Sequence, residues 1–242
     1  MNSNTPKLVI TGAAGWLGSN LVNAVVNGFS DRTELPETLK NAHVSAGAYA
    51  SDLANLDSYG DRVNWITADI RNETDARNLF ANAAEATVIH CAGLIHPRKI
   101  RELYEVNVAG TLNVIRAASA NDAKRVVVLS SNSPIGASTD SSVVFNEDSP
   151  YAPYMNYGRS KMMMEQQARE LADELGIELV LIRAPWFYGP RQPARQAVFF
   201  TMIRNGKAPV LGSGENKRSM AYIDNLSQGL LLAAAIPAAS GN

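Results

Sequence analysis

The sequence contains very little cysteine and histidine, and neither charge is in excess. Its one cysteine, Cys91, excludes an internal disulfide and suits a reducing compartment, so we expect a cytoplasmic protein. The three histidines show no metal-ligand spacing, and we expect no metal site. A formal net charge of −1 offers no basic surface to nucleic acid or to an anionic membrane. There is also no apolar run of transmembrane length and no signal-peptide pattern at the start, so the expected partner is a small molecule.

Short apolar segments alternate with longer amphipathic ones along the 242 residues. Strands are predicted at 7–11, 43–49, 63–68, 87–91, 125–129 and 177–182, and helices at 19–26, 73–84, 100–120, 154–175 and 224–236. Such alternation predicts an α/β fold with a parallel, doubly wound sheet and right-handed crossovers. The strand at 125–129 is nearly all β-branched, so we expect it to be central. Residues 28–41 are polar and are interpreted as a loop.

A glycine-rich turn follows the first predicted strand and precedes the first helix. It reads TGAAGWLG at 11–18. In this context Gly12 permits the tight turn, Gly15 lets the backbone approach a pyrophosphate, and Gly18 lets the helix pack closely. The helix N-terminus would offer free N–H groups to phosphates. The second predicted strand ends near Tyr49, Ser51 and Asp52, and this region leaves NAD and NADP undecided.

Tyr157 and Lys161 are four residues apart, on one face of a predicted helix that ends at Gly176. An ammonium about 4 Å from a tyrosine hydroxyl could lower its pKa by up to about three units before desolvation opposes the shift. Tyr157 would then be a usable general acid/base. By itself the pair is more typical of a surface tyrosine beside a solvated lysine.

Several further segments together resemble the extended short-chain dehydrogenase/reductase family, of the NAD-dependent epimerase/dehydratase type. Besides TGAAGWLG, they are ADI at 68–70, HCAG at 90–93, NVAGTLN at 107–113, VLSSNS at 128–133, YGRSK at 157–161, RAPWFYGPR at 183–191 and RSMAYIDN at 218–225. The resemblance runs from about Lys7 to Ala235. It implies a Rossmann-like domain made of 1–185 and 223–236, and a small C-terminal substrate lobe at 186–222.

The resemblance also implies roles for individual residues. The catalytic set would be Ser131, Tyr157 and Lys161, although Ser130 and Ser133 stay open as alternatives to Ser131. Substrate would meet Ser131, Trp186 and Arg218. The cofactor, NAD or NADP, would contact a longer series of residues: Gly12, Gly15, Trp16, Leu17, Gly18, Asp69, Ile70, Cys91, Ala92, Gly93, Tyr157, Lys161, Ala184 and Pro185. Asn107 matches an asparagine that supports the geometry of the active site in the wider family, or acts here as a structural hydrogen-bonding residue.

The implied function is hydride transfer at a secondary alcohol or ketone, with Tyr157 as the acid/base. The alternatives are a nucleotide-sugar 4-epimerase with tightly bound NAD, and a non-catalytic dinucleotide sensor. Trp186 replaces an asparagine of some sugar epimerases, and Asn132 and Ser133 replace the acidic pair of the dehydratases, which disfavours dehydration. The resemblance further implies a homodimer built on helices 100–120 and 154–175, which are apolar on more than one face. Because relatives continue beyond the last residue, we expect the substrate lobe to be incomplete.

Overall fold

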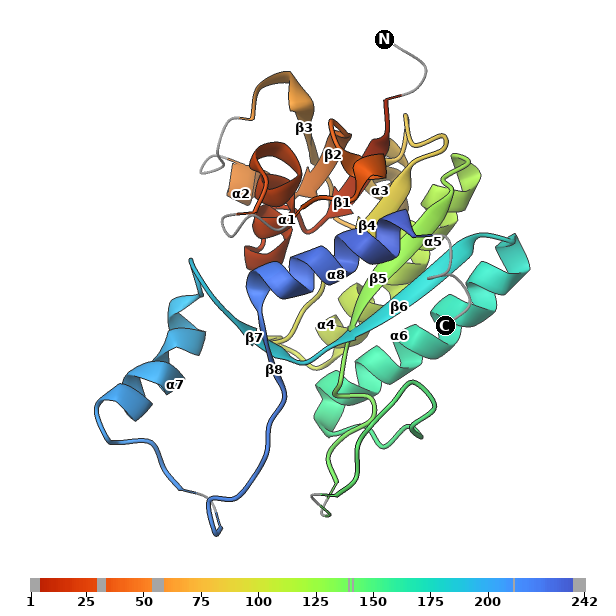
Figure 1. Ribbon diagram of the computed structural model, residues 1–242. Helices are drawn as coiled ribbons and strands as arrows, with labels where there is room; N and C mark the ends of the chain where they lie inside the picture. Colours follow the sequence, from red (N-terminus) through yellow and green to blue (C-terminus); the bar gives the residue numbers. More distant parts are fainter. Residues whose placement is uncertain are drawn as a thin grey trace.

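The fold is a parallel sheet with helices on both faces, as seen in a computed structural model (Figure 1). The model describes residues 5–29, 34–53, 59–138, 140, 142–210 and 212–236. Six strands are ordered β3-β2-β1-β4-β5-β6, and every neighbouring pair is parallel. In spatial order they are β3 (Val63–Thr67), β2 (His43–Ala48), β1 (Lys7–Thr11), β4 (Thr87–His90), β5 (Arg125–Ser131) and β6 (Glu178–Ala184). The predicted Rossmann-like sheet is confirmed.

The order of the strands places the point of reversal between β1 and β4. In a doubly wound sheet this is where ligands bind, outside the carboxyl ends of the strands. β5 is paired on both sides, with β4 and β6, so it is an interior strand as expected, although β1 and β4 occupy the middle. Four of its seven residues, Arg125 to Val128, are buried in succession, which matches a strand covered on both faces.

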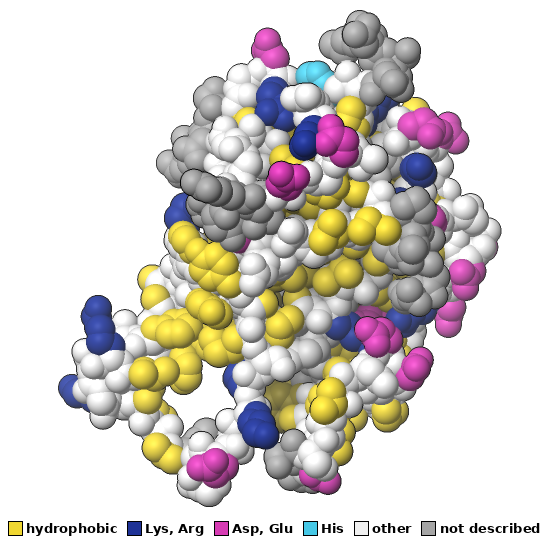
Figure 2. Space-filling model, in the orientation of Figure 1, with side chains coloured by type: hydrophobic (Ala, Val, Ile, Leu, Met, Phe, Trp, Pro, Cys, Tyr) yellow, Lys and Arg dark blue, Asp and Glu magenta, His cyan; other side chains and the backbone are white. Residues whose placement is uncertain are grey.

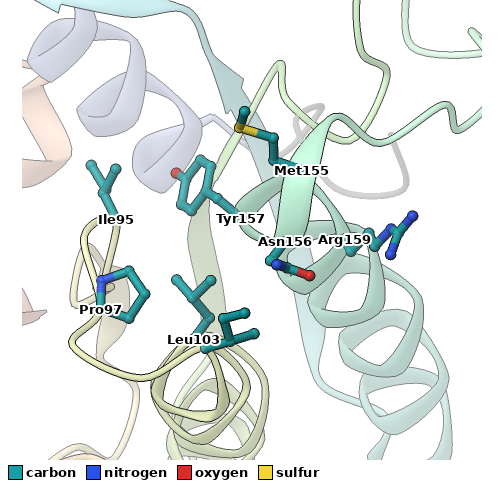
Figure 3. A pocket seen from close by; sticks show the side chains of 8 residues that line it. Ile95, Pro97, Leu103, Met155, Asn156, Tyr157 and Arg159 are labelled. Atoms are coloured by element: carbon teal, nitrogen blue, oxygen red, sulfur yellow. The ribbon is translucent and has the colours of Figure 1, made fainter.

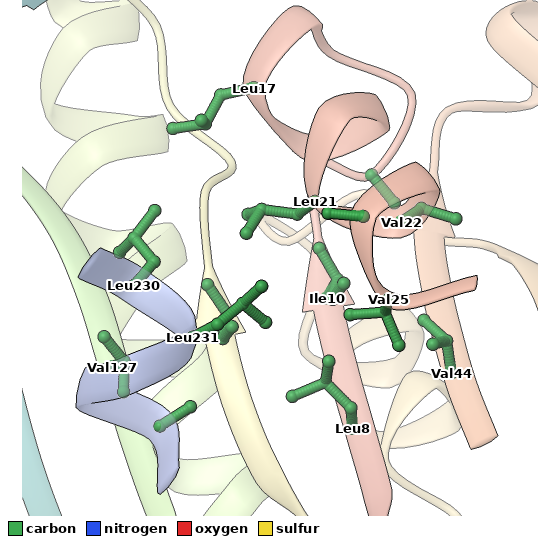
Figure 4. Close-up of a cluster of buried hydrophobic side chains, with 14 of the residues drawn as sticks. Leu8, Ile10, Leu17, Leu21, Val22, Val25, Val44, Val127, Leu230 and Leu231 are labelled. Atoms are coloured by element: carbon green, nitrogen blue, oxygen red, sulfur yellow. The ribbon is translucent and has the colours of Figure 1, made fainter. Parts of the chain in front are cut away.

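Helices cover the two faces of the sheet in separate layers. α1 (Trp16–Asn27) and α8 (Ile223–Ala235) pack together on one face, where Leu21 and Leu231 meet Ile10 of β1 in the first apolar cluster (Figure 4). α3 (Glu73–Leu79), α5 (Thr111–Ala120) and α6 (Met155–Leu175) lie over the opposite face in the second cluster. Since successive strand residues point to opposite faces, the sheet contributes alternate side chains to each cluster.

Three predicted helices differ from the observed ones in their limits or their form. α1 begins at Trp16, three residues before the predicted start, because the glycine turn leads directly into it. α3 ends at Leu79 and not at residue 84. The predicted helix 100–120 is helical throughout but divides into α4 (Arg101–Tyr104), the π-helix η3 (Glu105–Gly110) and α5. α6 ends at Leu175, and Gly176, the predicted stop, is its C-cap with a left-handed φ of 65°.

The shorter elements complete the chain. They are η1 (Glu37–Leu39), α2 (Ala50–Leu53), η2 (Gly60–Arg62), β7 (Trp186–Tyr188), α7 (Ala194–Arg204) and β8 (Met220–Tyr222). The loop predicted at 28–41 therefore contains a short 3-10 turn, while residues 30–33 lie outside the described part. β7 and β8 form a separate two-stranded parallel sheet, and α7 stands beside it away from the main sheet (Figure 1). The division into two domains stays a prediction.

Apolar side chains gather on the surface around this second sheet and α7 (Figure 2). Val198 is 54% exposed, Phe199 42% and Ile203 51%, and the whole of α7 contains no buried residue. None of the described helices is long and apolar enough to cross a membrane.

Candidate active site

The glycine turn after β1 has the geometry that its sequence predicts. Gly12 has a φ of 67°, and a Cβ atom there would lie 2.7 Å from the backbone nitrogen of Ala92. A Cβ atom on Gly18 would lie 2.1 Å from the carbonyl oxygen of Gly12, so only glycine lets α1 approach the turn this closely. A Cβ atom on Gly15 would meet only that same oxygen, at 3.1 Å, and would otherwise point into open space.

A cavity of about 220 Å³ opens beside this turn at the carboxyl ends of β1, β2 and β4. Six of the predicted cofactor residues line it: Gly12, Gly15, Ile70, Cys91, Ala92 and Gly93. Gly15 is the N-cap of α1 and has no side chain to cap it, so the first turn of the helix can present its N–H groups to a phosphate. The open side of Gly15 and this uncapped helix fit a dinucleotide.

Three other predicted cofactor residues direct their side chains elsewhere. The Trp16 indole donates to the carbonyl oxygen of Pro190 at 2.8 Å and stacks on Phe187, 4.9 Å between ring centroids. Leu17 is buried in the first apolar cluster. Asp69 accepts hydrogen bonds from the Arg71 guanidinium, and this pairing lowers the pKa of the Asp69 carboxyl. The Trp16 and Leu17 side chains are thus used in packing, and the Asp69 carboxylate is paired with Arg71.

Sequence reasoning did not assign several other residues of the cavity wall, among them two aliphatic and two polar ones. Leu94 and Val106 line it on the side of the loop after β4, and Tyr49 and Asp52 line it near the end of β2. Burial and the nearby Asp69 carboxylate raise the pKa of Tyr49, so its hydroxyl stays protonated at neutral pH. The sequence offered Tyr49 and Asp52 as residues at the end of the second strand. It did not assign them to the cofactor site, because β2 ends late after the glycine turn.

Ser131, Tyr157 and Lys161 converge at the end of β5 and the start of α6. The Lys161 ammonium is buried and donates to the carbonyl oxygen of Leu129 at 2.9 Å. A Cβ atom on Gly93 would lie 3.6 Å from its nitrogen, which places Lys161 against the wall of the cavity. The Ser131 hydroxyl lies near enough to the Tyr157 hydroxyl to lower its pKa.

The pKa values of this group differ from the sequence-based expectation. Burial raises the pKa of Tyr157, and the hydrogen bond from Ser131 opposes this rise only in part. Burial also lowers the pKa of Lys161 to about 8. A lowered tyrosine pKa would need a further positive charge in the cavity.

The three serines at the end of β5 and just after it lie in different surroundings. The Ser130 hydroxyl is buried and donates to the Glu165 carboxylate at 2.5 Å. Ser131 lies 3.0 Å from the Ser133 hydroxyl oxygen and also accepts from the Ser133 backbone N–H at 3.1 Å. Ser130 is thus directed to Glu165, whereas Ser131 is near enough to Tyr157 to lower the pKa of its hydroxyl.

Glu165 is a fully buried carboxylate that sequence reasoning did not assign. It accepts from the Arg183 guanidinium at 2.8 Å and from the Tyr151 hydroxyl at 2.9 Å, in addition to Ser130. The Arg183 guanidinium also lies over the Tyr151 ring, 5.3 Å from its centroid. This network joins α6 to β5 and β6 behind the serines. Its signal in the sequence is a glutamate four residues after Lys161 on the same helix face.

A second buried network joins the loop after β4 to α6. Asn107, in η3, accepts from the Leu94 N–H at 2.7 Å and donates to the Leu94 carbonyl oxygen and to the Ser160 hydroxyl. Ser160 in turn donates to the carbonyl oxygen of Tyr157 at 2.8 Å. Asn107 therefore makes structural hydrogen bonds that position the tyrosine's helix, which was one of its two predicted roles.

His90 connects this network to β1. Its ring lies 2.6 Å from the Thr11 hydroxyl and 2.9 Å from the Thr111 hydroxyl, and burial lowers the pKa of His90 to about 3. Thr111 already donates to the carbonyl oxygen of Asn107, so its oxygen accepts from His90. His90 is thus a neutral structural histidine. No cluster of three metal-ligating side chains occurs among the described residues.

The predicted substrate residues of the lobe lie together. The Arg218 guanidinium stands 5.2 Å from the centroid of the Trp186 ring, which also contacts Phe199 and Phe200. Both phenylalanines pack on Trp186, but Phe199 stays 42% exposed. Ala184 is buried, and its carbonyl oxygen accepts from the Asn132 N–H.

Comparison with known proteins decides the family. Residues 8–242 match the model of the NAD dependent epimerase/dehydratase family. The chain belongs to this family. A protein of Sinorhizobium fredii described as uncharacterised is 43% identical over 99% of this chain and 67% of its own length. A UDP-glucose 4-epimerase of Vibrio cholerae is 31% identical over 90% of this chain and 63% of its own length. The chain thus spans about two thirds of the length of these relatives.

Solved structures place the fold in the same family. A dTDP-glucose 4,6-dehydratase of Streptomyces venezuelae, determined with NAD and TYD bound, superposes with a TM-score of 0.75 at 25% identity, over 95% of this chain and 72% of the other. A UDP-glucose 4-epimerase of Thermotoga maritima, with UDP-glucose, superposes with a TM-score of 0.73 at 23% identity, over 94% of this chain and 72% of the other. The predicted membership of the epimerase/dehydratase type is confirmed.

Proposed function

We propose that the protein binds NAD in the cavity beside the glycine turn and catalyses hydride transfer at a secondary alcohol or ketone. The observation that carries this proposal is the convergence of Ser131, Tyr157 and Lys161 next to that cavity. Lys161 lies against Gly93 in the cavity wall, and Ser131 is near enough to Tyr157 to lower the pKa of its hydroxyl. The family's dependence on NAD and its motifs along the whole chain support it.

Each residue would have a distinct role. Ser131 would hold the substrate oxygen by a hydrogen bond, and Tyr157 would take or give the proton of that oxygen. Lys161 would bind the ribose on the nicotinamide side, and its positive charge would face the site when protonated. A bound nicotinamide supplies the hydride acceptor or donor. Because its oxidised ring is positive, it would offset the rise that burial causes in the tyrosine pKa.

We propose NAD rather than NADP as the cofactor. The Asp52 carboxylate lines the cavity near the end of β2 and accepts from the Ser51 hydroxyl at 3.0 Å. A carboxylate in this region can hydrogen-bond a ribose hydroxyl and repels a phosphate. The nearby Arg71 guanidinium is paired with Asp69, which makes it less suited to a 2′-phosphate.

A nucleotide-sugar 4-epimerase is the second candidate. The identity with the epimerase of Vibrio cholerae favours it, and Arg218 could bind a diphosphate. Trp186 stacks with Arg218 and replaces a residue that some sugar epimerases use, which argues in the other direction. A dinucleotide sensor without activity is disfavoured, because such proteins usually lose the tyrosine or the lysine and this chain keeps both.

The first experiment is to purify the protein without added nucleotide, denature it, and identify the released compounds by mass spectrometry. Tightly retained NAD supports an epimerase, which restores its cofactor within one turnover. Release of no nucleotide, with micromolar binding of NAD on titration, supports a dehydrogenase or reductase. Absence of any dinucleotide binding would contradict the proposal.

Once a substrate is known, wild-type turnover by Tyr157→Phe would contradict the role of Tyr157.

We also propose a cytoplasmic homodimer. Helices α5 and α6 support the homodimer, because they pack on each other and leave Leu112 and Met163 only partly buried. Half-buried apolar side chains on two adjacent helices suit a four-helix contact between two copies.

A further inference from the structure

A second, larger pocket lies beside Tyr157 and is separate from the cofactor cavity. Its volume is about 440 Å³, and it opens between the loop after β4 and the first turns of α4 and α6 (Figure 3). The two pockets have no lining residue in common. Tyr157 forms part of the wall of the larger one, and Ile95 follows directly after Leu94 of the cofactor cavity. A molecule in this pocket would therefore contact both the tyrosine and the loop that separates the two spaces.

The wall of this pocket is apolar apart from two side chains at its edge and the tyrosine itself. Ile95, Pro97, Ile100, Leu103 and Met155 supply aliphatic or thioether surface. The other two lining residues are Asn156 and Arg159, which lie on the far side of Tyr157 from Ile95 and Pro97, with Arg159 extending away from them (Figure 3). The described wall contains no carboxylate and no hydroxyl other than that of Tyr157.

Much of this apolar surface faces water. Ile95 is 49% exposed, Ile100 56% and Met155 66%. Met155 also has a φ of 56°, a left-handed conformation that a residue with a long side chain rarely adopts. Such conformations cluster at ligand-binding sites, where the surroundings hold them in place. Here the conformation fixes Met155 at the rim, two residues before Tyr157.

We propose that this pocket binds the hydrocarbon part of the substrate, so that the reacting carbinol or ketone carries an apolar substituent on the side that faces Ile95. The proposal rests on the proposed acid/base role of Tyr157. A hydrocarbon group would cover the exposed aliphatic side chains and release their ordered water. A hydroxylated ring would give up its hydrogen bonds to water and find no partners in this wall to replace them.

The test compares two ring compounds that differ in their hydroxyl groups. Cyclohexanol and myo-inositol are titrated separately into the protein saturated with NAD, and binding is followed by ligand-observed NMR. Cyclohexanol should bind at least about tenfold more tightly than myo-inositol. Equal affinities, or tighter binding of myo-inositol, would overturn the proposal.

A pair of matched variants locates the binding. Ile95→Asn should weaken cyclohexanol binding by about tenfold, because it places an amide in the apolar wall. Val144→Asn makes the same kind of change at a side chain that is 86% exposed and lies outside the pocket wall, and it should leave binding unchanged. Unchanged binding by Ile95→Asn would contradict the assignment. A dimer that dissociates in Ile95→Asn would show that a second copy covers the pocket, which also contradicts it.

Failure of the proposed reaction has a different signature. Reduction of NAD by cyclohexanol, followed by absorbance, reports hydride transfer independently of binding. Selective binding without any reduction supports the pocket and counts against cyclohexanol as a reactive alcohol. Tyr157→Phe should abolish the reduction while cyclohexanol binding persists. If that variant still reduced NAD at the wild-type rate, the role of Tyr157 would fail and the pocket would lose its assignment as part of the substrate site.

Discussion

At the scale of single residues, Ser130 and Ser131 are adjacent in the chain, but their hydroxyl groups lie in different surroundings. Successive residues of β5 point to opposite faces, so Ser130 reaches the buried Glu165 carboxylate while Ser131 reaches Tyr157. The serine residues and their spacing left three choices for the catalytic hydroxyl. The surroundings of each hydroxyl favour Ser131, which supports the proposed assignment.

Alanine substitutions should separate the two serines. Ser131→Ala should lower turnover by about 100-fold or more, since it removes a hydrogen bond to the reacting oxygen. Ser130→Ala should retain turnover within a few-fold and lower the free energy of unfolding by about 1–3 kcal/mol, because the buried Glu165 loses a donor. Steady-state rates and urea unfolding measure the two effects. A larger loss of turnover in Ser130→Ala would reverse the assignment.

The buried ammonium of Lys161 should make stability depend on pH. Burial lowers its folded-state pKa from 10.5 to about 8, so the folded chain releases this proton before the unfolded chain does. Between these pH values the unfolded state binds more protons, and stability rises with pH. The destabilisation is full below pH 8 and is relieved as the pH approaches 10.5. The shift corresponds to about 3 kcal/mol.

Lys161→Met is the matched control for this dependence. The methionine does not titrate, so the difference in free energy of unfolding between the wild type and Lys161→Met isolates the lysine. That difference should change by a few kcal/mol in favour of the wild type between about pH 8 and 10.5. Urea unfolding at a series of pH values measures it. A difference that is constant with pH would mean that Lys161 titrates in the folded chain as it does in the unfolded one.

At the scale of elements, the glycine turn and α1 form one unit in which each glycine meets a different constraint. Gly18 carries the closest contact, between α1 and the turn, while Gly15 faces open space. An ordinary tight turn with no ligand would require the close contact at Gly18 but not the open space at Gly15. The open side of Gly15 is therefore the feature that points to a phosphate.

Gly15→Ala and Gly18→Ala should have different effects. Gly18→Ala forces a Cβ atom within 2.1 Å of the Gly12 oxygen, so α1 must shift, and the free energy of unfolding should fall by several kcal/mol. Gly15→Ala should leave the fold close to wild type and weaken NAD binding by about tenfold or more, because the methyl group occupies the expected phosphate space. Urea unfolding and NAD titration distinguish the two. Wild-type NAD affinity in Gly15→Ala would exclude the phosphate site there.

The contact between α6 and β6 depends on the buried ion pair of Glu165 and Arg183. The Glu165 side chain is 0% exposed, so its charge needs the guanidinium. Arg183→Met should therefore cost about 3–5 kcal/mol in the free energy of unfolding. Arg77→Met breaks the ion pair between Arg77 and Glu73, whose side chains are 67% and 65% exposed, respectively. It should lower the free energy of unfolding by less than about 1 kcal/mol.

The double variant Glu165→Met/Arg183→Met tests the reason for this cost. Removing both charges leaves no unpaired buried carboxylate, so the double variant should be more stable than Arg183→Met alone. Urea unfolding of the three variants and the wild type gives the comparison. If the double variant were the least stable, packing around the pair and not the unpaired charge would explain the loss.

At the scale of the whole molecule, the proposed homodimer accounts for half-buried apolar side chains on α5 and α6. Sedimentation at micromolar concentration should give a dimer. Met163→Glu should shift it to monomer, because it places a charge in the contact. Val144→Glu, at an exposed loop position, is the control and should remain dimeric. A clean wild-type monomer would contradict the homodimer.

The order and type of the main elements follow from the sequence alone, because short β-branched runs and amphipathic periods are local patterns. The glycine turn is equally local, since Gly12, Gly15 and Gly18 meet their constraints within one strand-turn-helix unit. Local patterns also predicted Gly176 as the end of α6. The division of helix 100–120 was not predictable in this way, because the π-helix η3 contains Asn107, whose partners lie in the loop after β4 and on α6.

Tertiary structure alone decided the surroundings of the site residues. The pKa of Tyr157 rises because burial outweighs its hydrogen bond with Ser131, and burial depends on contacts between distant segments. The same applies to Glu165, whose partners come from β5, β6 and the loop before α6. The sequence by itself determined the family, the sheet and two of the candidate catalytic residues, Tyr157 and Lys161, while it left three serines open for the third. Which face each side chain occupies, and which charge or apolar wall it meets there, depends on the packing of elements far apart in the chain.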